Sequence, residues 1–161
     1  YRDHVYPSQT EPLDAMAAYR PSIQDLMATL GANQHSYAMH WEHMHDPFNK
    51  HLVHQLANKR NIPMAELNRA LLITGGLPLH RSATGTPVPS LEQMPETASD
   101  HERLEVMQHN ERYAETLYAE LLSEDDLPAG LRRLLQEQLR ATRSIVLILA
   151  EALRSGEQHA A

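Results

Sequence analysis

The histidines are the residues of this chain with the clearest potential for chemistry. Six of the 11 histidines fall between positions 35 and 54. His40 and His43 are three residues apart, as are His51 and His54, and this spacing on a helix places two imidazoles on one side. Neutral imidazole is a ligand of zinc, copper, nickel and iron. One hypothesis is a divalent transition-metal site formed by these four histidines, with Glu42 as a further ligand.

The alternative interpretation treats the same histidines as surface residues. At helical periodicity, His43, His51 and His54 point away from the predicted core, and His40 lies at its edge. The cluster would then consist of solvated side chains or belong to an interface. Such an interface would respond to pH, because histidine titrates near neutrality.

A second set of polar residues interrupts the apolar stripes of four predicted helices. The interrupting residues are Gln34, Arg60, Glu111, Gln138 and Thr142. Each lies roughly 11 to 14 residues into its helix, so we expect them to form one central polar layer. Within this layer Glu111 is either a metal ligand or the partner of Arg60 in a buried ion pair. An unpaired buried charge would cost several kcal/mol, which favours the pair.

Four long helices must position these groups. The predicted helices are 21–45, 47–74, 99–122 and 128–155. An irregular arm at 1–20, with at most a short helical turn around Leu13–Tyr19, precedes them. The first and last of these helices begin at proline, which suits a first helical turn. Together they predict an all-α four-helix bundle at 21–156, followed by a short tail at 157–161.

Local signals support these boundaries. Asp46 followed by Pro47 is typical of a helix that caps and restarts. Ser99 and Glu102 form a capping box at the start of the third helix. Pro63 lies inside the second helix and should kink or split it near Asn61, because proline removes a backbone hydrogen bond.

The segment 77–98 is rich in proline and lacks helical periodicity. Twenty-two extended residues span about 70 Å, whereas a helix of 25 residues is only about 37 Å long. We therefore expect a long loop that crosses over the length of the bundle.

The apolar stripes predict the core and one exposed patch. The predicted core includes Leu26, Leu30, Tyr37, Leu56, Leu67, Leu104, Met107, Tyr118, Leu135 and Leu149. The run Ile145–Leu149 is apolar on every side of its helix, so Leu147 should face away from the core. This predicts a homo-oligomer or a helical protein partner. Coverage by the N-terminal arm or by the long loop is the alternative.

Composition excludes several other functions. The chain has 161 residues and no cysteine, which excludes disulfides, thiolate metal sites and cysteine nucleophiles. A formal net charge of −7 without a basic stripe argues against nucleic-acid binding. The longest apolar run, Ile145–Ala150, is too short to cross a bilayer. We expect a cytoplasmic protein. A periplasmic or secreted one stays open, because the sequence begins at Tyr1 and not at methionine.

Several short stretches form a pattern through their order. They are Gly31 with Tyr37, Asp46-Pro47, Glu66-Leu67, Thr74 to Pro78, Asn110-Glu111 with Tyr118, and Asp126-Leu127-Pro128 with Leu134-Leu135 and Gln138. This order, over about residues 22–155, resembles the small bacterial ferritin-like, rubrerythrin-related four-helix-bundle proteins of unknown function. The resemblance implies a ferritin-like bundle with a long crossover between the second and third helices.

The chain departs from that pattern where metal would bind. Ferritin-like bundles hold two metals with a Glu from two helices and a Glu-x-x-His pair from the other two. No such pair occurs in the last three predicted helices, and the match at Glu42 and His45 lies off the core face. Glu111 is the one carboxylate on a core stripe.

Three hypotheses about function follow from these observations. The leading one is a non-enzymatic, self-associating binding or structural protein without an intact di-iron site. A metal-binding bundle that uses residues 35–54 is the first alternative. A di-metal oxidoreductase centred on Glu111 is the second.

Overall fold

The computed structural model describes residues 10–73 and 94–159, with side chains for 18–72 and 94–157. Its elements are α1 Thr10–His40, the 3-10 helix η1 Trp41–His43, α2 Pro47–Lys59, α3 Asn61–Ile73, α4 Asp100–Leu122 and α5 Ala129–His159. The described residues contain helices and no strand, which confirms the all-α class. None of the described helices is sufficiently long and apolar to cross a membrane.

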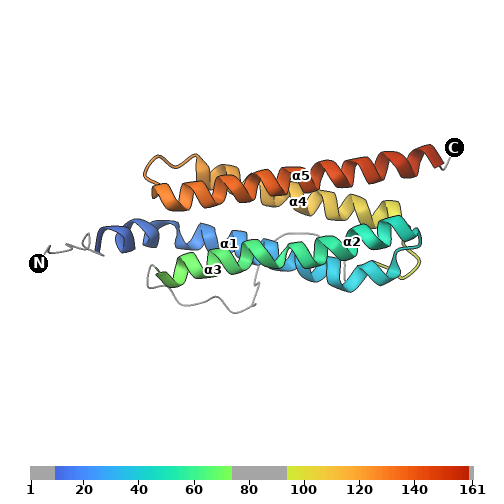
Figure 1. Cartoon of the computed structure of the whole chain (residues 1–161), viewed down its shortest axis with the longest axis horizontal. Coiled ribbons are helices and arrows are strands. Elements are labelled where there is room, and N and C mark those ends of the chain that lie inside the picture. Colours follow the sequence, from blue (N-terminus) through green and yellow to red (C-terminus); the bar gives the residue numbers. More distant parts are fainter. Residues whose placement is uncertain (1–9, 74–93, 160–161) are drawn as a thin grey trace, which may run out of the picture.

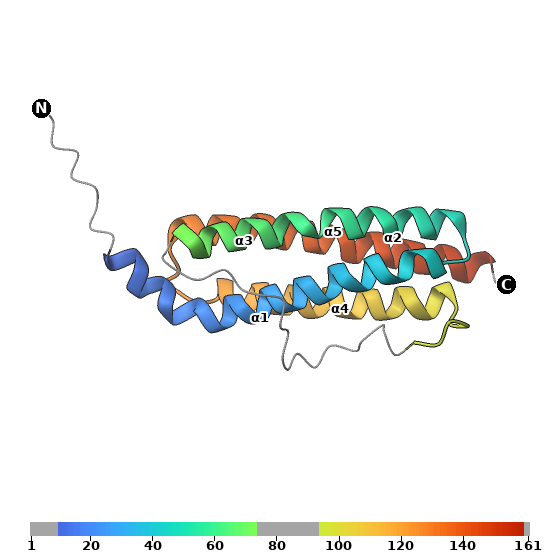
Figure 2. The same cartoon turned by 90° about the horizontal axis from the view of Figure 1, so that it is seen from below.

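The helices form a bundle of four arms, because α2 and α3 together make one arm. In Figure 1, α4 and α5 lie above α1 and the α2–α3 arm. Figure 2, turned by 90°, places α1 beside α4 and the α2–α3 arm beside α5. Helix α1 packs against α2, α3 and α4, and α4 packs against α5. The predicted four-helix bundle is confirmed at this level.

Two hydrophobic clusters fill the two halves of the bundle. The first contains Tyr19, Ile23, Leu26, Met27, Leu30, Leu67, Leu71, Ala114, Tyr118, Leu121, Leu127, Leu131, Leu135 and Leu139. The second contains Tyr37, Met44, Val53, Leu56, Ala57, Leu104, Met107, Ile145, Leu149 and Ala152. Most members come from the predicted apolar stripes, so helical periodicity identified most of the core. Tyr19, Ala57, Leu127 and Leu139 are buried members that the stripes did not include.

Membership of the two clusters also gives the helix directions. The first half of α1, residues of α3, the end of α4 and the start of α5 meet in the first cluster. The opposite ends, together with α2, meet in the second. Helices α1 and α5 therefore run one way, and the α2–α3 arm and α4 run the other way (Figures 1 and 2).

This arrangement bears on the predicted loop between the second and third predicted helices. Helix α3 ends at the first cluster, whereas α4 begins at the second. A crossover at 77–98 would connect these two ends. Residues 77–93 of that segment lie outside the described residues, so the crossover stays a prediction.

The turn between α1 and α2 follows the local signals. Asp46 is the N-cap of α2, and its side chain accepts hydrogen bonds from the backbone N–H groups of Phe48 and Asn49 at 2.7 and 3.3 Å. Pro47 occupies the first turn of the helix. Ser99 caps α4 in the same way, because its hydroxyl accepts a hydrogen bond from the N–H of Glu102. Both predicted helix starts are confirmed.

The second predicted helix splits where expected. Helix α2 ends at Lys59 and α3 begins at Asn61, so Arg60 lies in the break. Pro63 stands one turn later and has no N–H to give to the backbone. The interruption places Arg60 between two helical segments, with its side chain only 2% exposed.

Three predicted helix limits are wrong. Helix α1 ends at His40 and is followed by η1, so it does not continue to residue 45. The first helix begins at Thr10 and contains Pro21, so the residues from 10 to 20 are helical and not an irregular arm. Burial of Tyr19 in the first cluster explains how this segment is held despite the proline. Helix α5 continues through Gly156 to His159, beyond the predicted end at 155. Glycine disfavours a helix only modestly, so a single glycine does not end it.

Candidate functional site

A buried ion pair lies at the centre of the bundle, between the two hydrophobic clusters. Glu111 of α4 is 0% exposed, and Arg60 faces it from the break between α2 and α3. The guanidinium donates from Nε to Oε1 of Glu111 at 2.9 Å, and from Nη2 to Oε2. This two-point contact is the strong form of an Arg–carboxylate pair. Burial lowers the pKa of Arg60, but the nearby Glu111 carboxylate outweighs this effect and raises it, so the arginine stays charged.

Tyr37 of α1 completes the coordination of the carboxylate. Its hydroxyl donates to Oε1 of Glu111 at 2.6 Å. Burial raises the pKa of Tyr37 well above its ordinary value, and the negative charge of Glu111 and the hydrogen bond to it raise the pKa further. Tyr37 is therefore a hydrogen-bond donor throughout the physiological pH range.

A second part of the hydrogen-bond network links α5 to α4 and to the α2–α3 arm. Arg60 Nη2 donates to Oγ1 of Thr142 at 3.2 Å, and the Thr142 hydroxyl donates to the backbone oxygen of Gln138 at 2.9 Å. The amide of Gln138 accepts from the Tyr118 hydroxyl at 2.9 Å and donates to the Pro63 carbonyl at 3.3 Å. The five groups tie α3, α4 and α5 together in one layer.

Four of the five residues predicted for the central polar layer are brought together. Arg60, Glu111, Gln138 and Thr142 are all buried and linked by hydrogen bonds. Gln34 is only half-buried, and it takes no part in the hydrogen bonds of this layer as far as the structure describes them. The layer therefore consists of an ion pair and its hydrogen-bonded neighbours. This agrees with the interpretation of Glu111 as the partner of Arg60.

The two tyrosines of the network were predicted only as core residues. Tyr37 lies three residues after Gln34, and Tyr118 lies seven residues after Glu111 on the same helix face. That spacing was a usable signal, because a buried tyrosine hydroxyl usually finds a polar partner. Periodicity identified the side of the helix but not the hydroxyl's partner.

A further buried cation was not predicted. Arg103 of α4 is 1% exposed and donates from Nη2 to the backbone oxygens of Pro95 and Glu96 at 3.1 and 3.3 Å. Its Nη1 lies 2.7 Å from Nδ1 of His40. Arginine can only donate, so Nδ1 of His40 is the acceptor and is occupied by Arg103. Its spacing of four residues from Met107 places Arg103 on the core face, which was the available signal.

The histidine cluster does not converge on one point. The rings of His40 and His43 have centroids 6.1 Å apart, and His43 is exposed. His54 stacks on Trp41, with ring centroids 4.3 Å apart. His51 and Glu42 are also exposed. Within residues 10–73 and 94–159, no group of three or more histidines and carboxylates is placed to hold a metal ion.

An open depression of about 1070 Å³ lies at the end of the bundle where α2 and α4 begin and α5 ends. Its polar centre is Asp100, which accepts hydrogen bonds from the backbone N–H groups of His45 and Asp46 at 2.8 and 3.0 Å. The Asn49 amide donates to the same carboxylate at 3.0 Å. Partial burial raises the pKa of Asp100, but these hydrogen bonds outweigh it and hold the pKa below the ordinary value. The carboxylate is engaged in joining the α1–α2 turn to α4.

The fold and the site define an all-α four-helix bundle with a central polar layer built on a buried ion pair. Comparisons of the chain with protein-family models, with curated proteins and with solved structures give no match. The ferritin-like resemblance is therefore a hypothesis that rests on the order of short stretches in the sequence.

Proposed function

We propose that this protein is a non-enzymatic, ferritin-like helical bundle that acts as a binding or structural module and self-associates. In this proposal the central layer is a structural element and not an oxidoreductase centre. The order and directions of the helices support the ferritin-like part, since α3 and α4 have ends that a long crossover would join.

The observation that carries the proposal is the position of Arg60. Its guanidinium contacts both carboxylate oxygens of Glu111 and takes the space that a cation bound there would need. Glu111 is also the one buried carboxylate among the described side chains. A di-metal centre needs several convergent carboxylates, and a fixed positive charge opposes any cation at that point.

The exposed apolar side chains support a role in binding. Large hydrophobic residues with at least 40% exposure are Met39, Phe48, Ile62, Leu72, Leu147 and Ile148. Scattered single residues of this kind are normal on a protein surface. Leu147 and Ile148, however, are adjacent on α5 and 69% and 40% exposed. The α5 surface is therefore the best supported contact region.

The proposal is tested by elemental analysis of protein purified without an affinity tag, before and after loading with Fe²⁺, Zn²⁺ and Cu²⁺. We expect far less than one bound metal per chain after gel filtration. Stoichiometric iron that disappears in Glu111→Ala would support the di-metal oxidoreductase and contradict the proposal.

The metal-binding alternative predicts a different pattern in the same experiment. Stoichiometric metal would be lost in a His51→Ala/His54→Ala double variant. His109→Ala is the matched control, because His109 is exposed on α4 and lies outside the cluster. Retention of metal by the control and its loss in the double variant would establish the alternative.

A further inference from the structure

The outward face of α5 carries one regularly spaced row of side chains. The row, called the α5 outer stripe, consists of Glu137, Arg140, Ser144, Leu147, Glu151 and Arg154. Successive members are three or four residues apart, which keeps them on one side of a helix. All six are exposed, so the described part of the molecule leaves this face open.

The order of charges along the stripe is self-complementary. From its start to its end the stripe reads negative, positive, polar, apolar, negative, positive. When a second copy of the stripe runs in the opposite direction, Glu137 faces Arg154 and Arg140 faces Glu151. Leu147 then lies beside Ser144 of the second copy, at the centre. Because each pairing occurs twice, one two-fold axis produces four opposite-charge pairs.

We propose that the protein forms a two-fold dimer through antiparallel pairing of the α5 outer stripe. The partner is a second copy of the same chain, and Leu147 with its neighbour Ile148 forms the apolar centre. This inference rests on the proposed function, since it names the partner of the α5 surface. In this pairing the residue numbers of two facing positions always have the same sum, as they do in antiparallel coiled coils.

Other alignments of the stripe are disfavoured by charge. A parallel, in-register dimer would place Glu137 against Glu137 and Arg140 against Arg140. An antiparallel alignment shifted by one heptad would place Leu147 against Glu137 or Glu151. Like charges and unpaired charges at an interface reject a wrong register.

Among the described residues, contacts within one chain do not block the stripe. Arg154 pairs with Glu151 three residues earlier, but both side chains are 68% exposed. An exposed pair of this kind contributes little to stability, so exchange for a partner across the dimer needs little energy. The apolar centre is small, so we expect a concentration-dependent dimer that high salt weakens.

The test uses charge reversal at Arg140 and Glu151 in the full chain. Arg140→Glu and Glu151→Arg each replace two attractive pairs by two repulsive ones across the axis. Each single variant should raise the dimer dissociation constant roughly tenfold or more. Sedimentation equilibrium over a range of concentrations measures it, and circular dichroism checks that each variant is folded. Arg112→Glu is the matched control, because it makes the same charge change on an exposed site of α4.

Two combinations of these charge reversals distinguish the antiparallel dimer from other arrangements of the two chains. The double variant Arg140→Glu/Glu151→Arg restores opposite charges only if position 140 faces position 151 of the second copy. Within one helix these positions are too far apart to touch. We also expect an equimolar mixture of the two single variants to form a heterodimer. In a parallel, in-register dimer, each reversal only replaces one like-charge pair by another. Wild-type affinity in both single variants, with tighter association in their mixture, would therefore identify a parallel dimer and overturn the proposal.

The remaining outcomes also decide the matter. A wild-type chain that stays monomeric at every concentration overturns the proposal, as does a dimer that both single variants leave unchanged. Variants that lower the unfolding temperature of a monomeric chain would show that the chain's own segments cover the stripe. Metal analysis of the same samples is independent of these readings, so failure of the dimer and failure of the non-metal function are distinguishable.

Discussion

The central layer and the α5 outer stripe use the same charged residue types in opposite environments. In the layer, Arg60 and Glu111 are 2% and 0% exposed and their partners are fixed. On the stripe, Glu151 and Arg154 are each 68% exposed. Removal of one member of a buried pair is expensive, because the remaining charge stays out of water. An exposed pair contributes little to stability but can select a partner. We infer that burial decides whether a charge pair specifies the fold or an association.

The largest expected effect is at Glu111. Glu111→Ala leaves the guanidinium of Arg60 buried without its carboxylate, so we expect the free energy of unfolding to fall by about 3–5 kcal/mol. Urea denaturation measures this loss. Glu120→Ala, an exposed change on the same helix, should have little effect. The double variant Arg60→Leu/Glu111→Leu should be less destabilised than Glu111→Ala. If Glu111→Ala and Glu120→Ala lose the same stability, the buried pair does not have the role assigned to it.

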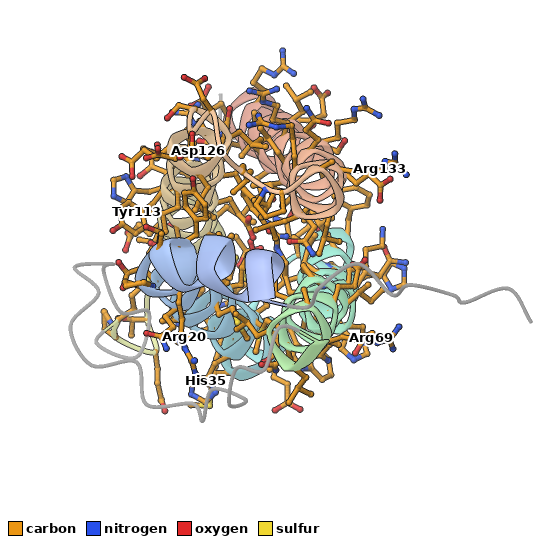
Figure 3. The ribbon with its side chains drawn as sticks, turned by 90° about the vertical axis from the view of Figure 1, so that its left-hand side faces the viewer. Arg20, His35, Arg69, Tyr113, Asp126 and Arg133 are labelled. Atoms are coloured by element: carbon orange, nitrogen blue, oxygen red, sulfur yellow. The ribbon has the colours of Figure 1, made fainter. Side chains whose placement is uncertain are left out.

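The next largest effect is expected at Tyr37. Tyr37→Phe removes the hydroxyl that donates to Glu111 and leaves the rest of the ring in the core. Hydrogen bonds to charged groups contribute about 1.5–3 kcal/mol, and we expect a loss in that range by thermal or urea unfolding. Tyr113→Phe is the control, because Tyr113 is half-buried on α4 and lies at the periphery in Figure 3. Equal losses in the two variants would contradict the proposed difference between the layer and the surface.

A smaller, pH-dependent effect is expected at Asp100. Its hydrogen bonds hold its pKa below the ordinary aspartate value in the folded chain. Its stabilising contribution is thus fully present above the unfolded pKa of about 3.9, and it is lost as the pH falls through the lower folded pKa. Asp100→Asn should destabilise the chain by about 1 kcal/mol near neutrality. The difference from wild type should shrink at acid pH. Urea midpoints at both pH values measure it, and a pH-independent difference would refute this assignment.

The smallest effect is expected at an exposed pair between α4 and α5. Arg143 Nε lies 3.3 Å from Oε1 of Glu115, and these side chains are 57% and 32% exposed. Arg143→Ala should change the free energy of unfolding by less than about 0.5 kcal/mol. If Arg143→Ala lost as much unfolding free energy as Tyr37→Phe, buried and exposed charges would not differ in their contribution to stability.

The labelled residues of Figure 3 illustrate the same distinction from outside the bundle. Viewed along the bundle axis, Arg69 of α3 and Arg133 of α5 lie at the periphery, and Asp126 lies on the α4–α5 turn at the end of the bundle. All three are exposed. Among the side chains that the structure describes, most charges lie at the surface, and the buried Arg60, Arg103 and Glu111 are the exceptions that need partners.

The sequence by itself determined the features that depend on local interactions. The N-caps at Asp46 and Ser99, the break before Asn61 and the apolar stripes follow from residues within a few positions of one another. Periodicity also placed Arg60 and Glu111 in one layer, because both lie near the middle of a stripe. Side-chain capping and helical geometry require no knowledge of distant contacts.

Only the tertiary structure decided how the layer is connected and where the first helix begins. Tyr37, Arg60 and Glu111 are separated by dozens of residues, and the choice among hydrogen-bond partners depends on helix positions that no local pattern specifies. Helix α1 continues through Pro21 while Tyr19 is buried against residues of α4 and α5, so long-range packing outweighs a local helix-breaking signal. From the sequence it was predictable that charges buried in the bundle need partners. Their partners were set by the packing of four helices.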